Sequence, residues 1–499
     1  MNKGKICIPV CSKTTDEMAL QIRKAEEFAD LIELRLDCLS LSEQLPDSLQ
    51  FKSAKPLLFT YRPANQGGHA DDDPAKRIFF WRSLAGNASL EKAWVDLETE
   101  LIEDVELSST DKIVSVHDFS GVPADIAGLF DALGKNGEMV KIAVQANDFG
   151  DSIGVWKLLE RARMQAKKVI PVAMGEAGKW TRILGLAHGA FLTYASLETG
   201  SETAPGQISA KDMVETYRVR ELDKSTKVFG IIGDPVSQSL SPYMHNPAFV
   251  SRGINAVFIP FLVRDLDAFM TQMVRPETSE VGLDFGGLSV TMPHKQAIMK
   301  HLDKIDETAS MIGAVNTVKV EGGKLIGYNT DAHGFITPLK KMFGDLNASR
   351  VALFGAGGAA RACVFALKRE GVDVTVFVRD LQKAKAFAEE LQVPLDLMKN
   401  ARLKDFDIVV DATPFGMKGE LENRSLFTAD DLTGLKFVYD LVTKPYGTPI
   451  VREAKKANVP TLGGLEMLVA QGVEQFRIWT GEEASGDEMK ASLTARLSM

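Results

Sequence analysis

The chain has 499 residues and a formal net charge of −9, with 45% hydrophobic and 25% charged residues. This is the composition of an ordinary globular protein, and the length corresponds to roughly three compact units. A mildly acidic chain without an apolar run of transmembrane length has neither the charge expected of a nucleic-acid binder nor a membrane span. We therefore expect small-molecule partners rather than nucleic acid or a membrane.

The four cysteines, Cys7, Cys11, Cys38 and Cys363, show no CxxC pair and no histidines at the spacing of a zinc site. The sequence predicts reduced thiols and no bound metal. The first residues show neither the apolar stretch of a signal peptide nor the composition of a transit peptide, so we expect a cytoplasmic protein.

Short apolar runs recur through the first 195 residues, with helical patterns between them. Strands are predicted at 5–10, 31–36, 56–61, 93–98, 112–117, 139–145, 168–174 and 190–195. Helices are predicted at 16–29, 74–86, 122–134 and 152–166, with an eighth at 208–221. Eight strands that alternate with helical segments predict a (β/α)8 barrel.

A polar stretch without periodicity at 221–227 marks the expected end of this first domain, which we assign to residues 1–222. A new apolar strand follows at 228–233, and strand–helix alternation resumes from there. We therefore expect a second α/β domain, with a glycine-rich turn at 355–358 in its middle.

The catalytic groups of a (β/α)8 barrel lie at the C-terminal ends of its strands. Lys141 is the unusual residue there, because a lysine within a β-run is costly to bury as an ammonium ion. It could form an ion pair with Glu33 or Asp96. Alternatively, burial could favour the neutral amine, which is a nucleophile toward ketones. His117 could then act as the base for the neighbouring carbon, or it could be structural.

Six motifs, in order, resemble type I 3-dehydroquinate dehydratase and cover residues 1 to about 220; they lie at 33–37, 59–68, 116–119, 141–143, 174–182 and 204–207. The resemblance implies that Lys141 forms a Schiff base with the substrate and that His117 is the general acid–base. It also implies that Arg182 clamps the substrate carboxylate. The remaining substrate-binding residues that it implies are Glu33, Arg35, Arg62, Thr203 and Gln207.

Gln66 is a departure from this family, which usually has Glu immediately before the Gly67-Gly68 pair, where it orients the histidine. An amide can hydrogen-bond an imidazole but cannot stabilise an imidazolium by charge. We expect a lower His117 pKa and slower turnover than in relatives with Glu.

In the second domain, a strand at 351–354 runs into a glycine turn that opens a helix. Such a turn lets the backbone approach a pyrophosphate, and the helix N-terminus attracts the anion. The candidate cofactor residues of this turn are Gly355, Ala356, Gly357, Gly358 and Ala359. The next strand ends at Arg379, which suits the 2′-phosphate of NADP, although Asp380 follows it and a solvated loop arginine is the alternative.

Polar loops upstream of this turn contain Lys295 and Asp331, which could polarise a reacting oxygen during hydride transfer or could form a surface salt bridge. These loops, together with 411–414, 439–440 and 463–471, resemble shikimate dehydrogenase from about residue 228 to the C-terminus. The resemblance implies a Lys295–Asp331 catalytic dyad and NADP as cofactor. The substrate-binding residues that it implies are Ser239, Ser241, Thr291, Asn316, Tyr439 and Gln471, and it adds Thr413 and Gly464 to the cofactor site.

The shikimate dehydrogenase resemblance also implies a substrate subdomain at 226–335, completed by returning helices at 465–499. A Rossmann subdomain at 336–464 would bind NADP. Two departures stand out, because the family often has Asn at Ser289 and Asn-Arg-Thr in place of 378–380. The second departure leaves the strictness for NADP over NAD open.

The two resemblances describe consecutive reactions, since the dehydratase product, 3-dehydroshikimate, is the substrate of the dehydrogenase. We therefore expect a bifunctional enzyme of the shikimate pathway, either a monomer or a homodimer. The alternatives are a dehydrogenase half that acts on quinate and a non-catalytic regulatory relative. The presence of all four candidate catalytic residues argues against the regulatory alternative.

Overall fold

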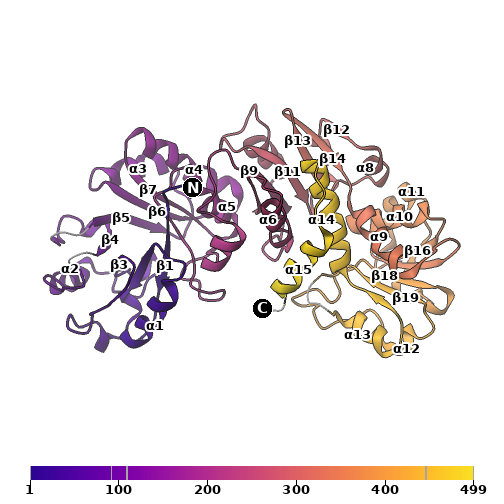
Figure 1. Ribbon diagram of the computed structural model, residues 1–499, viewed down its shortest axis with the longest axis horizontal. Helices are drawn as coiled ribbons and strands as arrows, with labels where there is room; N and C mark the ends of the chain where they lie inside the picture. Colours follow the sequence, from indigo (N-terminus) through magenta and orange to yellow (C-terminus); the bar gives the residue numbers. More distant parts are fainter. Residues whose placement is uncertain (1, 91–92, 108–110, 444–446, 498–499) are drawn as a thin grey trace. The chain divides into compact units, whose positions relative to one another are not determined.

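The computed structural model describes residues 2–90, 93–107, 111–443 and 447–497 (Figure 1). The chain divides into two compact units. The first contains 1–228, 235–237 and 255–284, and the second contains 229–234, 238–254 and 285–499. Within the described ranges, no helix combines the length and hydropathy needed to cross a membrane.

The first 195 residues form the predicted parallel barrel. Its strands are β1 (Lys5–Val10), β2 (Leu31–Arg35), β3 (Leu57–Thr60), β4 (Trp94–Glu98), β5 (Asp111–Asp118), β6 (Met139–Gln145), β7 (Lys168–Met174) and β8 (Leu192–Tyr194). They are hydrogen-bonded in the order β7-β6-β5-β4-β3-β2-β1-β8. A backbone bond of 2.9 Å from Phe191 N–H to Val169 O lies beside the β7–β8 seam, so the barrel is nearly closed. All eight predicted strands are confirmed.

Helices α1 (Thr15–Ala25), α2 (Pro74–Ser83), α3 (Ile126–Gly134), α4 (Phe149–Met164) and α5 (Lys179–Leu184) connect these strands. Side chains of Thr14, Asp73, Asp125 and Asp148 cap the first four helix N-termini. Among the described residues, the expectation of a helix after every strand is wrong for β2 and β4, which are followed by short 3-10 turns and no α-helix. The eighth predicted helix is reduced to a π-helical segment, Asp212–Thr216.

The barrel interior changes from apolar to polar along the strands. One apolar layer contains Cys7, Leu31, Leu58, Ile113, Met139, Ile170 and Leu192. Because side chains on a strand alternate between faces, the residues two positions further along point to the same side. On six strands these residues are polar: Glu33, Thr60, Asp96, Ser115, Lys141 and Tyr194. The strand period therefore places Lys141 in a polar layer directly above an apolar floor.

The second sheet has the strand order β10-β9-β11-β13-β14-β12. Its strands are β9 (Lys227–Gly233), β10 (Ala256–Leu262), β11 (Phe285–Val290), β12 (Lys304–Ile305), β13 (Thr317–Glu321) and β14 (Lys324–Tyr328). The accompanying helices are α6 (Ser241–Ser251), α7 (Leu266–Phe269) and α8 (Glu307–Ile312). Lys295 lies in the segment after β11, and Asp331 begins the helix that follows β14.

The third sheet is parallel and has the order β17-β16-β15-β18-β19-β20, the 3-2-1-4-5-6 order of a dinucleotide-binding fold. Its strands are β15 (Arg350–Phe354), β16 (Asp373–Val378), β17 (Leu395–Leu397), β18 (Ile408–Asp411), β19 (Phe437–Asp440) and β20 (Thr461–Leu462). Leu353 and Phe354 belong to different apolar clusters, so both faces of the sheet are covered. The predicted Rossmann architecture is confirmed.

Helices α9 (Asp331–Phe343), α10 (Gly358–Arg369), α11 (Leu381–Leu391), α12 (Ala429–Leu432) and α13 (Pro449–Lys456) accompany the third sheet. The C-terminal segment forms α14 (Gly464–Thr480) and α15 (Gly486–Leu497). α14 packs along α9, and it also contacts β11 and β13 of the second sheet (Figure 1). The returning helices predicted at 465–499 correspond to α14 and α15. Residues 498–499 lie outside the described range.

The cysteine prediction is wrong for two residues, because Cys11 and Cys38 form a disulfide with a Cα–Cα distance of 5.4 Å. They are 27 residues apart, but β1 and β2 are parallel neighbours, with Val10 opposite Leu34. The residues that follow the two strand ends are therefore brought together by the barrel. Cys7 and Cys363 are free and buried.

Candidate active sites

A pocket opens at the C-terminal ends of the barrel strands. Its lining includes every site residue predicted for the first domain: Glu33, Arg35, Arg62, His117, Lys141, Arg182, Thr203 and Gln207. Gln66, Met174 and Tyr194 complete much of the remaining wall. These side chains come from six of the eight strands or the loops behind them, so only the barrel as a whole assembles the pocket.

Lys141 is buried on β6, and its Nζ lies 2.9 Å from Asp96 Oδ2, 2.9 Å from the Tyr194 hydroxyl and 3.8 Å from Glu33 Oε1. The ion-pair interpretation of this lysine is therefore confirmed for both carboxylates. It does not exclude the nucleophilic interpretation, because Lys141 also lines the pocket. The neighbours hold the nitrogen in one place at the base of the cavity.

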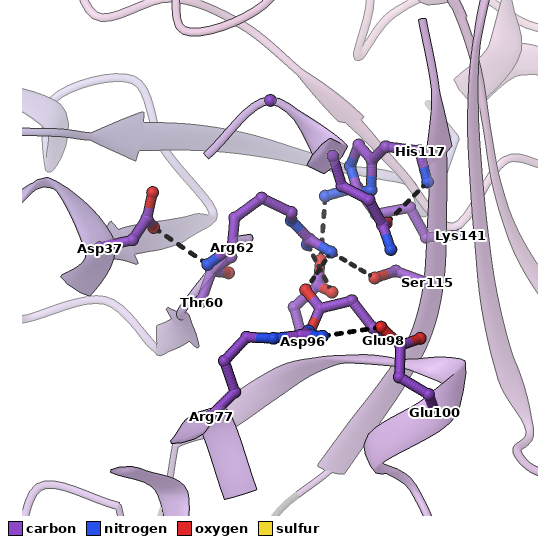
Figure 2. Close-up of polar contacts among 12 residues, drawn as sticks. Asp37, Thr60, Arg62, Arg77, Asp96, Glu98, Glu100, Ser115, His117 and Lys141 are labelled. Atoms are coloured by element: carbon purple, nitrogen blue, oxygen red, sulfur yellow. Dashed lines mark hydrogen bonds and ion pairs between the residues drawn. The ribbon is translucent and has the colours of Figure 1, made fainter. Parts of the chain in front are cut away.

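A chain of buried charges runs behind Lys141 (Figure 2). Arg62 contacts Asp96 at 2.7 Å and Glu98 at 2.6 Å, and Glu98 also contacts Arg77 at 2.8 Å. Burial opposes ionisation of Arg62, but the two carboxylates outweigh it and raise the arginine pKa. Burial also opposes ionisation of Asp96, but Arg62 and Lys141 outweigh it and lower the aspartate pKa. Both groups are therefore held in their charged forms.

Sequence reasoning missed Arg77, which is fully buried on α2 between Glu98 and Glu100. A single arginine on a helix gives no sign in the sequence that it points inward. The signal that could have found it is Glu98 on β4, a buried anion that one arginine alone does not fully pair.

His117 is the strongest candidate base in the pocket. Burial, followed by the charges of Arg62 and Lys141, lowers its pKa well below the usual range, so the ring is neutral at physiological pH. Its Nδ1 has no hydrogen-bond partner within the described residues. A neutral imidazole with an unoccupied ring nitrogen can accept a proton from a bound ligand.

Gln66 contacts the backbone of His117. Its Oε1 accepts a hydrogen bond from the backbone N–H of His117 at 3.0 Å, and the amide makes no bond to the imidazole. An amide can hydrogen-bond an imidazole, but the η3 turn Ala64–Gln66 directs this amide toward the β5 backbone. Gln66 fixes the strand that carries the histidine rather than the ring itself.

Arg182 on α5 is buried, and its Nη2 donates to the carbonyl oxygen of Pro205 at 3.2 Å, while its Nε has no partner among the described residues. Burial lowers its pKa to about 10, which leaves the guanidinium charged near neutral pH. A buried cation without a carboxylate partner is costly unless a ligand supplies an anion. Arg182 therefore marks where the carboxylate of a ligand would bind.

Arg35 and Gln207 are positioned by their neighbours. Asp37 accepts two hydrogen bonds from Arg35, at 2.9 and 2.7 Å, and a third from the backbone N–H of Arg62 at 3.2 Å. Gln207 Oε1 accepts from Thr203 N–H at 2.9 Å, which ties the two predicted residues of the last loop together.

In the second unit, Lys295 Nζ and a carboxylate oxygen of Asp331 are in direct ion-pair contact. Lys295 follows β11, and Asp331 is the first residue of α9. The other carboxylate oxygen accepts from Asn316 Nδ2 at 2.8 Å. With 17% of the lysine and 8% of the aspartate side chain exposed, this pair lies within a site rather than on an open surface.

Neutral groups surround this dyad. Asn316 also bonds Thr330, and Thr330 donates to Gln471 Oε1 at 3.4 Å. Sequence reasoning missed Gln475, which is buried and bonds Thr317 at 3.0 Å and Ser289 at 3.0 Å. Gln475 lies four residues after Gln471 on α14, and this spacing places both amides on one helix face. The hydroxyl of Ser289 therefore has a hydrogen-bond partner inside the protein.

The remaining predicted substrate residues divide into two groups. Ser241 begins α6, and its backbone N–H donates to Ser239 Oγ at 3.2 Å, while Thr291 is half-buried before the Lys295 loop. Tyr439 differs, because it is fully buried in the apolar core and its ring stacks on Phe335 with centroids 5.0 Å apart. The structure does not bring Tyr439 into the polar network.

The glycine turn after β15 is shaped for a phosphate ligand. Gly355 has a φ of +109°, and a Cβ there would lie 2.8 Å from the Ala412 carbonyl oxygen. Gly357 is the N-cap residue of α10, and no side chain hydrogen-bonds to the first backbone N–H groups of that helix. Ala356 and Ala359, which flank Gly357 and Gly358, also have small side chains. A Cβ on Gly358 would lie 3.0 Å from Lys295 Cδ, which brings the turn next to the dyad. These residues fit a dinucleotide.

The other predicted cofactor residues border this turn. Arg379 is exposed directly after β16. The adjacent Asp380 caps α11 and accepts from two backbone N–H groups of that helix, so its carboxylate has a structural use. Thr413 donates to Asp411 at 2.7 Å, and Gly464 starts α14, where a Cβ would meet the Leu441 carbonyl oxygen.

Four family models match the chain. Type I 3-dehydroquinase matches residues 6–224, and the shikimate dehydrogenase substrate binding domain matches 231–318. Shikimate / quinate 5-dehydrogenase matches 338–416, and the shikimate 5′-dehydrogenase C-terminal domain matches 464–494.

The chain is 35% identical to the bifunctional 3-dehydroquinate dehydratase/shikimate dehydrogenase of Arabidopsis thaliana, over 96% of this chain and 82% of that protein. It is 37% identical to shikimate dehydrogenase (NADP(+)) of Methanocaldococcus jannaschii, over 56% of this chain and 99% of the relative. A crystal structure of a shikimate dehydrogenase in complex with NADP+ superimposes with a TM-score of 0.52 at 38% identity, over 56% of this chain and 98% of that one. The shikimate dehydrogenase structure from Aquifex aeolicus gives 0.50 at 32% identity, over 55% and 99%.

Proposed function

The chain belongs to the family of bifunctional 3-dehydroquinate dehydratase/shikimate dehydrogenases, and from this premise we propose which residues perform its two reactions. The enzyme dehydrates 3-dehydroquinate to 3-dehydroshikimate and reduces that product to shikimate with NADPH. We assign the dehydratase to residues 1–222, the substrate subdomain of the dehydrogenase to 226–335 with the helices from 465, and the NADP subdomain to 336–464.

The observation that carries the dehydratase assignment is the union of three groups in one pocket: buried Lys141, neutral His117 and unpaired Arg182. Arg182 binds the substrate carboxylate, while Glu33, Arg35, Arg62, Thr203 and Gln207 bind the remaining polar groups of the ring. This orientation presents the substrate ketone to Lys141 at the base of the pocket.

Lys141 Nζ, as the free amine, attacks the ketone carbon, and loss of water leaves a protonated Schiff base. His117 removes a proton from the adjacent carbon, and the electron pair moves toward the iminium nitrogen. The resulting enamine expels the hydroxyl, which leaves as water with the proton held by His117. Hydrolysis of the Schiff base then frees Lys141 and the product.

Borohydride reduction in the presence of 3-dehydroquinate, followed by peptide mass mapping, tests this assignment. We expect a single adduct on Lys141, and none in Lys141→Ala. An adduct on a different lysine, or an unmodified protein that still turns over substrate, would overturn the Schiff-base assignment.

For the dehydrogenase, the glycine turn after β15 would hold NADPH next to the dyad, where the cofactor would supply the hydride for the carbonyl carbon of 3-dehydroshikimate. Lys295 donates a hydrogen bond and then a proton to the carbonyl oxygen, and Asp331 holds the lysine in place. Asn316 fixes the second oxygen of Asp331, so the dyad has one orientation. Ser239, Ser241, Thr291 and Gln471 bind the substrate, and Tyr439 is left as a prediction without support from the polar network.

The glycine turn at 355–359, with Thr413 and Gly464, would hold the pyrophosphate and nicotinamide portions of the cofactor, and Arg379 would bind the 2′-phosphate. The exposed position of Arg379 directly after β16 supports this role, because Asp380 is occupied as a helix cap. Arg379→Ala should raise the KM for NADPH by about 10-fold or more and leave that for NADH unchanged. Equal effects on both cofactors would contradict the assignment.

A further inference from the structure

Outside the pocket lining, a group of metal-ligating side chains lies at the same end of the barrel. The Sγ atoms of Cys11 and Cys38 and a ring nitrogen of His69 all lie within 4.8 Å of one another. Cys11 follows β1, Cys38 ends the turn after β2, and His69 follows the Gly67-Gly68 pair after β3. Three neighbouring parallel strands thus deliver the three ligands to one place.

The backbones that carry these side chains are held firmly. Gln21 Oε1 accepts from the N–H of Cys11 at 3.0 Å, and its amide nitrogen donates to the Cys11 carbonyl. Asp37, next to Cys38 in the chain, accepts from the N–H of His69 at 3.0 Å. The ligand positions are therefore preorganised, which lowers the entropic cost of binding an ion.

The side chains are also accessible. Both cysteines are half-buried and His69 is exposed, and the His69 ring makes no hydrogen bond within the described part of the chain. Two thiolates and one imidazole are a ligand set typical of Zn²⁺, which is tetrahedral and can take water as a fourth ligand. The two sulfurs are joined as a disulfide in this structure, so both can bind an ion only after reduction.

We propose that Cys11, Cys38 and His69 form a binding site for Zn²⁺ in the reduced protein, and that disulfide formation and metal binding are mutually exclusive states of this site. An external dithiol reduces the disulfide with two electrons and two protons and itself becomes a disulfide. The two thiols then lose their protons to solvent as Zn²⁺ binds both sulfurs and the neutral imidazole. The site is independent of the two catalytic assignments, since none of its ligands lines the pocket.

Titration with Co²⁺, which reports thiolate ligands by a charge-transfer absorption band, tests the proposal on the full chain. The protein is reduced with a phosphine and freed of reductant under anaerobic conditions before titration. We expect one equivalent of Co²⁺ to produce the band, Zn²⁺ to abolish it, and Zn²⁺ addition to release protons. The oxidised protein should show no band.

The matched control is the double variant Cys7→Ser/Cys363→Ser, which removes the two buried thiols and should keep the band. Cys11→Ser and Cys38→Ser should each lose it, and His69→Ala should weaken Co²⁺ affinity by at least about 10-fold. Because His69 is exposed, its variant should fold even if a cysteine variant does not, and circular dichroism checks this. No band in the reduced protein, a band in the oxidised one, or unchanged affinity in His69→Ala would overturn the proposal.

Discussion

The two candidate active sites each place a lysine against an aspartate, but they hold that pair in different ways. Lys141 lies on a strand inside a network of full charges that continues through Asp96, Arg62, Glu98 and Arg77. Lys295 lies on a loop, and its aspartate is oriented by amides and hydroxyls such as Asn316.

The difference fits the chemistry that we propose for each lysine. A nucleophilic lysine must lose its proton within a closed pocket, and surrounding charges keep its position while its own charge changes. A proton-donating lysine has only to remain charged and oriented, for which one carboxylate and neutral hydrogen bonds are sufficient. Substitutions that remove charge should therefore harm the first site through stability and pKa, and the second mainly through turnover.

The largest expected effect separates the two reactions. Lys141→Ala should lower dehydratase kcat by at least about 10⁴-fold, because the covalent route is lost, and should leave dehydrogenase kcat within about 2-fold. Both activities are measured on the same preparation, with 3-dehydroquinate in one assay and shikimate with NADP+ in the other. Loss of both activities together would mean that the two sites are not independent.

The reciprocal substitution should have a somewhat smaller effect. Lys295→Ala is expected to lower dehydrogenase kcat by about 10²- to 10⁴-fold, the usual range for loss of a general acid, without changing dehydratase turnover. Asp331→Asn serves as its companion, because it keeps the shape and removes the ion pair. If Asp331→Asn retained full dehydrogenase activity, Lys295 would not need the ion pair for catalysis.

The charge network makes a testable contribution to barrel stability. Arg77→Met leaves Glu98 with only Arg62 as a partner, and a buried anion that loses a partner should destabilise the fold by about 3 kcal/mol. The matched control is Arg82→Met on the same helix, where the ion pair to Asp104 spans 3.9 Å at an exposed surface and contributes less than about 0.5 kcal/mol. Thermal unfolding of both variants distinguishes the cases. Equal decreases in the melting temperature would show that the buried ion pair contributes no more to stability than the exposed one.

A carboxyl pair in the NADP subdomain predicts a pH effect on stability. Burial and the nearby Asp440 raise the pKa of Asp411 to about 7, above its ordinary value of 3.8. The folded state therefore binds more protons than the unfolded state between about pH 4 and 7, and stability falls as the pH rises through this window. Asp411→Asn should raise the stability at pH 8 by about 2 kcal/mol and change it little at pH 4.5. Identical pH slopes of the melting temperature in both proteins would contradict this.

The smallest effect concerns Gln66. In Gln66→Glu the carboxylate would accept the same His117 N–H and place a negative charge near the imidazole, so the His117 pKa should rise. The acid limb of the dehydratase pH–rate profile should then move to higher pH, and turnover near neutral pH should change by less than about 10-fold. An unchanged profile would show that residue 66 acts only through the backbone.

Local patterns in the sequence were sufficient to predict much of this protein. Short apolar runs separated by helical patterns predicted the eight barrel strands, and the turn at 355–358 predicted the dinucleotide fold, because each signal lies within one short segment. The position of Lys141 within one of these runs marked it as unusual, and the order of the motifs identified both families. The resemblance implied the pocket residues of the first domain, which lie on the strands or in the segments that follow them.

Tertiary structure alone decided the features that depend on which side chains meet across the fold. Cys11 and Cys38 pair because two parallel strands end side by side. Gln66 reaches a backbone rather than a ring because of its turn, and Arg77 points inward because Glu98 lies behind it. The spacing of residues along the chain does not predict such long-range contacts. A charged or polar residue therefore reveals its partner only when the elements have packed.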